Sequence, residues 1–307
     1  MKNQFLAVLL AFVILSCDDV ITVELPEADA LVAVDAWLYH EAEPQEIELY
    51  RTNTYFDTSV PLGIGGATVT VTDLATNRVY NFTEGENGSY EWTPATATDT
   101  FGIIGNEYLL SVQLQDRELQ SVSRLNRVVP IDSITWRLEE SNFFDDAYFG
   151  EFWATDAVGE GDTYWIKTWK NGIQLTKPAE VNLAWDGGFS EGDNADGITF
   201  IRPVRDGINP FDTDDNDELI SPYELGDSVY VEITSITQEA HFFLNSVITQ
   251  TDRQDGFGEL FATPLANVQS NIFSTVSTEK VVGFFCISAT SGLGRVFTED
   301  AIIEVPE

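Results

Sequence analysis

Beyond residue 30 the chain is dominated by short segments in which apolar and polar residues alternate. Residues 67–73 place Ala67, Val69 and Val71 on one face and threonines on the other. A period of two is typical of a β-strand with one buried face. Further segments of this kind, separated by Asn, Gly, Asp and Pro, occupy residues 31–39, 77–82, 88–92, 106–114 and 119–125. Strands at this spacing predict an antiparallel β-sandwich over residues 31–130.

A second β-rich domain is predicted over residues 131–307. The sequence PIDSI at 130–134 marks the boundary, and residues 163–176 (TYWIKTWKNGIQLT) contain the strongest hairpin signal, because Asn171 and Gly172 accept the left-handed dihedrals of a two-residue turn. Further strands are expected in the stretches 134–139, 227–236, 280–290 and 294–305.

One segment has a clear helical period. Residues 235–250 place an apolar stripe on one side of a helix, and Ser235 with Gln238 fits a capping box. The stripe consists of Ala240, Phe243, Leu244, Val247 and Ile248. The predicted fold class is therefore mainly all-β: an N-terminal antiparallel β-sandwich, and a second β-rich domain that carries one amphipathic helix near residues 236–250.

The chain begins with a basic and then apolar leader. Lys2 precedes the apolar residues 5–15, which are followed by Ser16 and Cys17. The apolar run is shorter than the roughly 20 residues that a membrane-spanning helix needs. This order of charge, apolar core and small residue is typical of a secretory signal peptide, and we predict that residues 1–16 are removed.

Cys17 is the predicted site of lipidation. The sequence ILSC at 14–17 resembles a bacterial lipobox, so that residues 17–30 would form a lipidated linker. An ordinary signal peptide that is cut elsewhere is the alternative. Asp18 and Asp19 resemble the surface-export signal of Bacteroidota lipoproteins, and they are also compatible with a solvated acidic linker.

The amino-acid composition limits the kinds of molecule that the protein is expected to bind. The chain has 51 acidic and 15 basic residues, a net charge of −36, which disfavours nucleic acid and anionic lipid headgroups. The apolar content of 43% supports real hydrophobic cores. Cys286 lies in the apolar sequence VVGFFCISA, and with Cys17 acylated it has no disulfide partner.

Short landmark sequences follow one another along nearly the whole chain: the lipobox, LVAVDAWL, GATVTVTD, GSY at 88–90, GNEY at 105–108, IDSI, TYWIKTWKNG, GDSV at 226–229, SITQEAHFFL, Pro264, Asn271 with Ile272, and VGFF at 282–285. In this order they resemble a family of Bacteroidota surface lipoproteins of unknown function whose genes are often found beside those of TonB-dependent outer-membrane receptors. The resemblance implies a surface-exposed accessory lipoprotein that helps such a receptor capture a nutrient, and it supplies no catalytic residues. The first domain, with Ala-x-Val-x-Val-x-Asp at 67–73 and Gly-x-Tyr at 88–90, also resembles prealbumin-like or carboxypeptidase-regulatory-type β-sandwiches, which implies a prealbumin- or immunoglobulin-like fold.

An acidic stretch at 212–218 offers a tentative calcium site. Oxygen ligands alternate along it, and a glutamate follows at the end of LISPYE. A glutamate at the thirteenth position and an aspartate in place of the turn glycine depart from the EF-hand pattern. A looser oxygen cage and a solvated acidic loop both remain compatible with the sequence. The candidate ligands are Asp212, Asp214, Asn216, Glu218 and Glu224.

Five of the seven tryptophans lie between residues 136 and 185. In the predicted hairpin, Trp165 and Trp169 share one face, while Tyr164 and Ile166 take the other. Apolar residues on both faces favour core packing. Trp169, which adjoins Lys170 and the turn, is the candidate for an exposed ligand-binding platform.

The sequence contains no nucleophile elbow, and the many carboxylates single out no catalytic pair. We therefore expect no enzyme, but a lipid-anchored outer-membrane protein that faces the exterior and serves a TonB-dependent receptor as a non-catalytic binding subunit. A cell-surface adhesive or structural protein is the alternative, and a carboxylate-based glycan hydrolase is less favoured.

Overall fold

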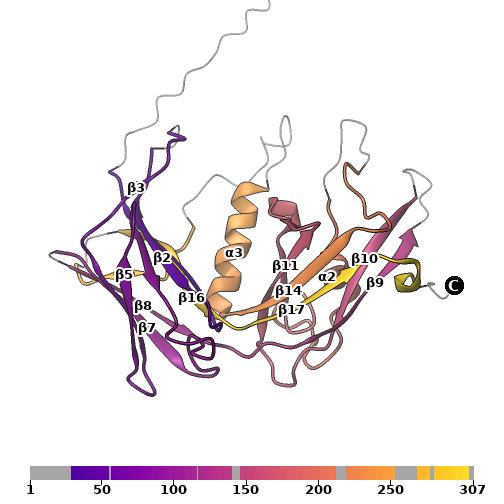
Figure 1. The fold of residues 1–307 in the computed structure, drawn as a ribbon, viewed down its shortest axis with the longest axis horizontal. Helices are drawn as coiled ribbons and strands as arrows, with labels where there is room; N and C mark the ends of the chain where they lie inside the picture. The colour runs from indigo at the N-terminus through magenta and orange to yellow at the C-terminus, as the bar shows by residue number, and fades with distance from the viewer. Residues whose placement is uncertain are drawn as a thin grey trace, which may run out of the picture.

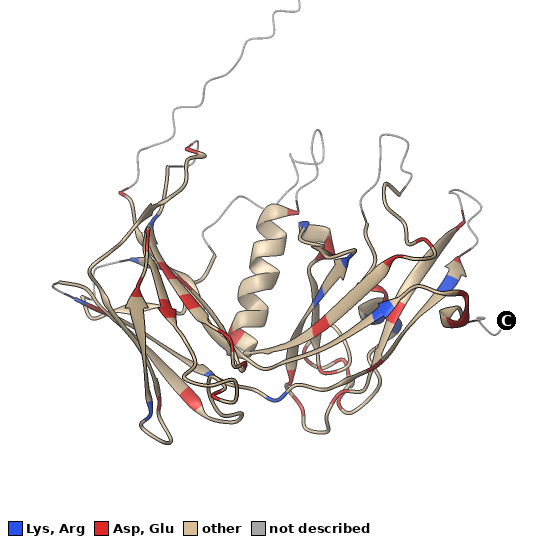
Figure 2. Ribbon diagram, in the orientation of Figure 1, with Lys and Arg blue, Asp and Glu red and all other residues tan. Residues whose placement is uncertain are grey.

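The computed structural model describes residues 29–54, 57–115, 117–139, 146–211, 219–252, 268–276 and 280–303 (Figure 1). The chain is mainly β, as the alternating pattern predicted. Acidic residues are distributed over the strands and loops of both halves (Figure 2). Within the described residues, no helix has the length and apolar character required to cross a membrane.

The first half is a sheet of ten strands that encloses one core. Its order is β15-β8-β7-β4-β5-β6-β2-β1-β16, with β3 paired to β2. The alternating segments bury one face each, and the backbone N–H of Ile287 on β16 donates to Ser123 Oγ on β8 at 3.1 Å, so the two ends of the sheet meet. The sequential strands are β1 (Val32–Tyr39), β2 (Gln45–Arg51), β3 (Leu62–Gly63), β4 (Thr68–Asp73), β5 (Val79–Glu84), β6 (Ser89–Trp92), β7 (Glu107–Gln113) and β8 (Glu118–Arg124).

The second half combines a two-stranded and a five-stranded sheet. Strands β9 (Ile131–Glu139) and β10 (Ala147–Ala154) form the first. The second has the order β12-β11-β14-β17, with β13 paired to β11. Its strands are β11 (Thr163–Lys170), β12 (Ile173–Gln174), β13 (Asn182–Trp185), β14 (Ser228–Ile236) and β17 (Thr290–Val296). Short helical turns lie at Pro178–Glu180, Arg202–Asp206 (α2) and Glu299–Ala301.

The predicted hairpin is confirmed. Asn171 and Gly172 have φ of 51° and 79°, and Lys170 pairs with Ile173 across the turn. Both central residues are left-handed, which matches the twist of the flanking strands.

The predicted helix is α3 (Gln238–Thr251), but its cap differs from the prediction. Thr237 is the N-cap, and its hydroxyl accepts the Ala240 N–H at 3.2 Å. Ser235 instead lies in β14, one residue before its end, and its hydroxyl donates to the Asn126 carbonyl at 2.9 Å. Strand pairing with β11 continues through Ile236, so the helix starts two residues later than a cap at Ser235 requires.

The C-terminal part of the chain returns to the first half. The sequence pattern predicts a second domain over all of residues 131–307, but β16 (Val281–Ser288) pairs in parallel with β1, and β15 (Phe273–Ser274) pairs with β8. A single residue, Ala289, separates β16 from β17, so one extended segment belongs to both main sheets. Figure 1 shows these two strands crossing between the halves.

A separate cluster of apolar side chains fills the space between the two halves, which we call the joint. The ring of Trp37 on β1 lies 5.7 Å from those of Trp165 and Phe284, and Phe243 of α3 lies 4.5 Å from Phe284. Helix α3 thus packs against both sheets at the joint, with Leu244 and other buried residues in the same cluster. This packing holds the second sheet in a fixed position beside the end of β1.

Candidate functional site

The site that we consider is the solvent-facing side of β11, β14 and β17, which we call the outer face. Alternation sends Tyr164, Ile166 and Val231 into the core, so the residues between them point outward. Register then aligns two rows across the sheet. The rows are Gln174, Trp169, Tyr230 and Gly294, and next to them Lys167, Glu232 and Gly292.

Trp169 and Tyr230 form an aromatic pair on this face. Their ring centroids lie 5.4 Å apart at 59° between the planes. The Tyr230 ring lies close over β17, because a Cβ at Gly292 would be 2.0 Å from its hydroxyl oxygen. Tyr230 remains 41% exposed. The absence of a side chain at Gly292 therefore lets a large ring lie against the backbone and stay accessible.

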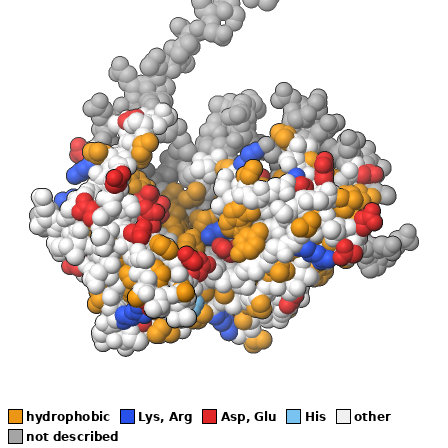
Figure 3. Space-filling model, in the orientation of Figure 1, with side chains coloured by type: hydrophobic (Ala, Val, Ile, Leu, Met, Phe, Trp, Pro, Cys, Tyr) orange, Lys and Arg blue, Asp and Glu red, His pale blue; other side chains and the backbone are white. Residues whose placement is uncertain are grey.

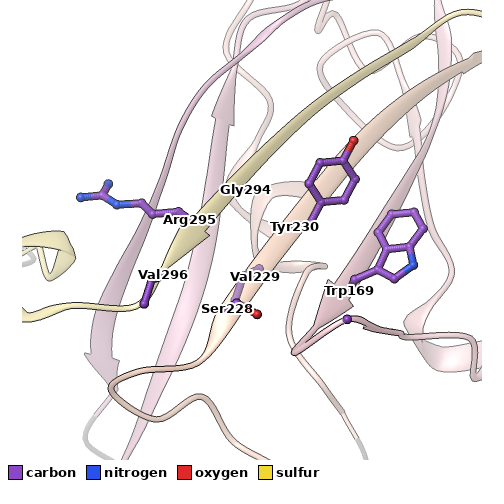
Figure 4. Close-up of a pocket in the computed structure, with 8 residues that line it drawn as sticks. Trp169, Ser228, Val229, Tyr230, Gly294, Arg295 and Val296 are labelled. Carbon is purple, nitrogen blue, oxygen red and sulfur yellow. The ribbon is translucent and has the colours of Figure 1, made fainter. Parts of the chain in front are cut away.

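A hollow of about 590 Å³ adjoins this pair, and it is mainly apolar. Figure 4 shows Trp169 and Tyr230 on the same side of the sheet, with Arg295 pointing away from both rings. The Arg295 guanidinium donates instead to the Ile134 carbonyl at 2.6 Å. The lining consists of Trp169, Gly172, Ser228, Val229, Tyr230, Gly294, Arg295 and Val296.

A second, more polar hollow of about 290 Å³ lies on the other side of Trp169. Lys167 Nζ lies there, 4.5 Å from the centre of the Tyr39 ring and 4.6 Å from that of Trp165. It also pairs with Glu232 at 3.3 Å and donates to the Tyr39 hydroxyl at 3.1 Å. Its lining is Tyr39, Glu41, Trp165, Lys167, Trp169, Gln174 and Glu232. Because Tyr39 ends β1, both halves of the molecule build this hollow.

The tryptophans divide as their local patterns suggest. Trp136 is fully buried against Phe297, with 4.6 Å between ring centroids, and Trp185 is 4% exposed. Trp165 is half-buried in the joint. Trp169 is half-buried and borders both hollows, so the residue singled out from the sequence lies at the centre of the site. Its role in binding a ligand stays a prediction.

Tyr230, Lys167 and Glu232 were not singled out from the sequence. The alternation in SVYVEITSI places Tyr230 and Glu232 on the polar side of β14. Their pairing with Trp169 and Lys167 depends on the register between β11 and β14, two strands separated by 57 residues of sequence. Local pattern alone leaves that register open.

Several predicted residues lie outside the described part of the chain. These include Cys17, Asp18 and Asp19, and four of the five tentative calcium ligands, Asp212, Asp214, Asn216 and Glu218. Glu224 is described, is exposed, and lies in a turn where its N–H donates to Asp227 Oδ2 at 2.9 Å. The lipidation, export and calcium predictions therefore remain untested.

Among the described residues, the carboxylates of Asp156, Asp162 and Asp186 lie within 4.8 Å of one another. Each already has partners in the chain. Asp156 accepts from the Tyr164 hydroxyl at 2.7 Å, Asp162 pairs with Arg127 at 2.6 Å, and Asp186 accepts two loop N–H groups. Burial raises the pKa of Asp156. Through these contacts the three carboxylates hold neighbouring loops together, which accounts for their proximity.

Cys286 has no features of a nucleophile. It is fully buried in the joint, and burial raises the pKa of its thiol. A thiol that resists ionisation is inert towards substrates. The absence of enzymatic activity nevertheless stays a prediction.

A larger hollow of about 880 Å³ lies between α3 and β8, and its wall combines polar side chains such as Gln120 and Asn126 with the exposed rings of Phe242 and Phe273. Figure 3 shows hydrophobic side chains gathered where the two halves meet. The outer face is distinguished by the neighbouring rings of Trp169 and Tyr230 on one sheet, with a hollow on each side of Trp169, and we take it as the candidate binding site.

Comparison with known proteins gives one family. No curated protein matches the chain. The model of a family described as a domain of unknown function, DUF4249, matches residues 18–292, which include every strand of the first sheet and the whole outer face apart from the end of β17. The chain thus belongs to the DUF4249 family, which spans nearly all of it.

Proposed function

We propose that this protein is a lipid-anchored, surface-exposed lipoprotein that binds a nutrient for a TonB-dependent outer-membrane receptor without catalysing a reaction. The observation that carries the binding function is the aromatic pair of half-buried Trp169 and exposed Tyr230, which lies on one sheet beside two hollows. Aromatic rings supply large contact areas at low entropic cost, and they are enriched in binding surfaces.

The proposed location rests on the leader. A cysteine that follows an apolar run and precedes Asp18 and Asp19 fits an acylated and exported N-terminus. Two or three acyl chains on Cys17 would anchor the protein stably, because each buried methylene contributes about 0.8 kcal/mol. The net charge of −36 keeps the folded part away from anionic headgroups, which favours a position at the end of a linker.

The order of the chain supports an accessory role. The described chain begins at Asp29, just before β1 starts at Val32, whereas Tyr39 at the other end of β1 lines the second hollow. Because β1 has eight residues, its two ends lie about 25 Å apart. The outer face is thus free to meet a ligand or receptor while the protein stays anchored.

The alternative is an adhesive or structural role at the cell surface. Its supporting observation is the excess of acidic residues, which occur on strands and loops of both halves (Figure 2) and which a divalent cation can bridge between neighbouring cells or polymers. The two roles predict different partners in the membrane.

The test is to isolate the native protein from its envelope in mild detergent and to identify what accompanies it by mass spectrometry. We expect a large β-barrel receptor in near-equal amount, and a diacylated or triacylated Cys17 at the N-terminus. A Cys17→Ser variant should be found outside the membrane fraction. Recovery of the intact lipoprotein without any such receptor would reject the accessory role, and an unmodified Cys17 would reject the anchor.

A further inference from the structure

We infer that the outer face binds a neutral oligosaccharide that crosses Trp169, with one sugar ring in each of the two hollows. The inference rests on the proposed binding function and names its ligand class. It depends on three properties of the described residues: the orientation of the aromatic rings, the balance of charge, and the placement of polar groups at the rim.

The aromatic rings suit the flat side of a sugar. A pyranose presents a layer of C–H groups whose partial positive charge is attracted to the negative face of an aromatic ring. Tyr230 exposes such a surface because Gly292 lets it lie over β17. Gly294, next in the same row, leaves the floor of the first hollow open. Trp169 stands between the hollows and can contact rings on both sides.

The charges favour a neutral ligand. Lys167 and Glu232 neutralise each other at 3.3 Å. The Lys167 ammonium already occupies the space between the Tyr39 and Trp165 rings, which would otherwise attract a cationic ligand. The remaining carboxylate of this hollow, Glu41, already accepts a hydrogen bond from the Thr290 hydroxyl at 2.7 Å. An anionic ligand would approach a protein with a net charge of −36, and Arg295 is turned away from the site.

The polar groups match hydroxyls. Lys167 donates, Glu232 accepts, and Gln174, which pairs with Trp169 across β11 and β12, can do both. All three line the second hollow, whereas the first hollow is mainly apolar. The ligand would therefore be held by stacking on one side of Trp169 and by hydrogen bonds on the other. The volumes of 590 and 290 Å³ fall near the usual range of about 300–1,000 Å³ for small-molecule sites.

Calorimetric titration of the full-length, detergent-solubilised lipoprotein tests this inference. The probes are six neutral hexasaccharides. Three are glucose hexamers with β-1,4, α-1,4 or β-1,3 linkages, and three are β-1,4-linked hexamers of xylose, mannose or galactose. Hexagalacturonate and choline serve as anionic and cationic comparisons. We expect at least one neutral hexasaccharide to bind, and to bind more tightly than either charged probe.

Three variants locate the site. Trp169→Ala and Tyr230→Ala should each weaken binding at least about tenfold, as removal of a central aromatic anchor does. Gly294→Leu should block the first hollow with little effect on folding, because a Cβ there meets only Tyr230 Cδ2 at 3.7 Å and the Val229 carbonyl at 3.8 Å. Phe273→Ala is the matched control, since Phe273 is 70% exposed on β15, in the first sheet. It should bind like the unchanged protein.

The outcomes separate the ligand class from the accessory role. Failure of all six neutral probes, tighter binding of a charged probe, or full affinity in a folded Gly294→Leu variant would overturn the inference. If the neutral probes fail while the β-barrel receptor still accompanies the native protein, the ligand class alone is wrong. If a neutral probe binds through Trp169 but no receptor is recovered, the inference stands and the accessory role fails.

Discussion

Replacement of Arg137 by methionine should destabilise the second half strongly. The Arg137 side chain is 3% exposed, and its Nε donates to Glu151 Oε1 at 2.7 Å. Its Nη2 donates to Asp206 Oδ2 at 2.8 Å, and a third contact reaches Glu139. Arg137 and Glu151 lie on the β9–β10 sheet, whereas Asp206 ends α2. The guanidinium therefore fastens the short helix to the sheet.

The expected loss follows from the charge that is left behind. Glu151 is as deeply buried as Arg137, and removal of one partner of a buried ion pair costs about 3–5 kcal/mol. Arg202 and Arg205 remain 3.4 and 3.5 Å from the Glu151 carboxylate, so we expect the lower limit, about 3 kcal/mol. The double variant Arg137→Met with Glu151→Leu removes the stranded charge and should regain about 2 kcal/mol.

The loss should depend on pH. Burial alone would raise the pKa of Glu151, but the hydrogen bond from Arg137 and the charges of Arg205 and Arg137 lower it below its ordinary value. A lowered pKa in the folded state contributes stability above the unfolded value of about 4.3, and this is lost as the pH falls. In Arg137→Met, the contribution of Arg137 that lowers the pKa of Glu151 is lost, so burial raises this pKa with less compensation. Protonation of Glu151 at low pH then removes the cost of the unpaired buried charge. The difference between the two proteins should shrink from pH 7 to pH 4.

Urea unfolding followed by tryptophan fluorescence measures this. With a slope of about 3 kcal/mol per molar, the Arg137→Met midpoint should fall by about 1 M at pH 7. Arg202→Met is the control, because its side chain is 46% exposed and its ion pairs should contribute less than about 1 kcal/mol. A midpoint within about 0.2 M of the unchanged protein, or a difference that grows as the pH falls, would refute the reasoning.

Four further predictions concern other parts of the chain. The Cys286 thiol, fully buried, should react with a thiol reagent only after denaturation; rapid labelling of the native protein would contradict its burial. Asp73→Ala should cost about 2 kcal/mol at pH 7, because the carboxylate accepts the Ala75 and Thr76 N–H groups and the Asn106 amide. Burial alone would raise the pKa of Asp73, but these hydrogen bonds outweigh burial, and the pKa lies below its ordinary value. The difference in urea midpoint between the variant and the unchanged protein should therefore diminish below about pH 4. Gly283→Ala should lower the melting temperature sharply, since its φ is +106° and a Cβ would lie 1.9 Å from the Val34 carbonyl oxygen; a normal melting curve would contradict the β1–β16 pairing. If the acidic stretch at 212–218 holds calcium, added calcium should raise the melting temperature and EDTA reverse it, whereas an equal effect of magnesium would indicate screening alone.

Local pattern was sufficient where neighbouring residues decide the outcome. The alternation at 67–73 specified β4 and its buried face, because a strand with one buried and one solvent-exposed face requires a period of two. Asn171 and Gly172 specified a turn because few residues accept left-handed dihedrals. The stripe that includes Leu244 specified helix α3. Its exact start was missed, because β14 continues through Ile236 to satisfy pairing with β11.

Sequence pattern was thus sufficient for the β-rich class, the hairpin, the helix and the position of Trp169 beside a turn, whereas Trp169 is half-buried and not exposed as expected. Only the tertiary structure decided that β16 returns to pair with β1, and that Tyr230 and Lys167 lie beside Trp169 on one surface. The physical reason is that pairing between distant strands is chosen by the whole set of buried contacts, including the Trp37 and Phe284 joint, and no short stretch of sequence contains that choice.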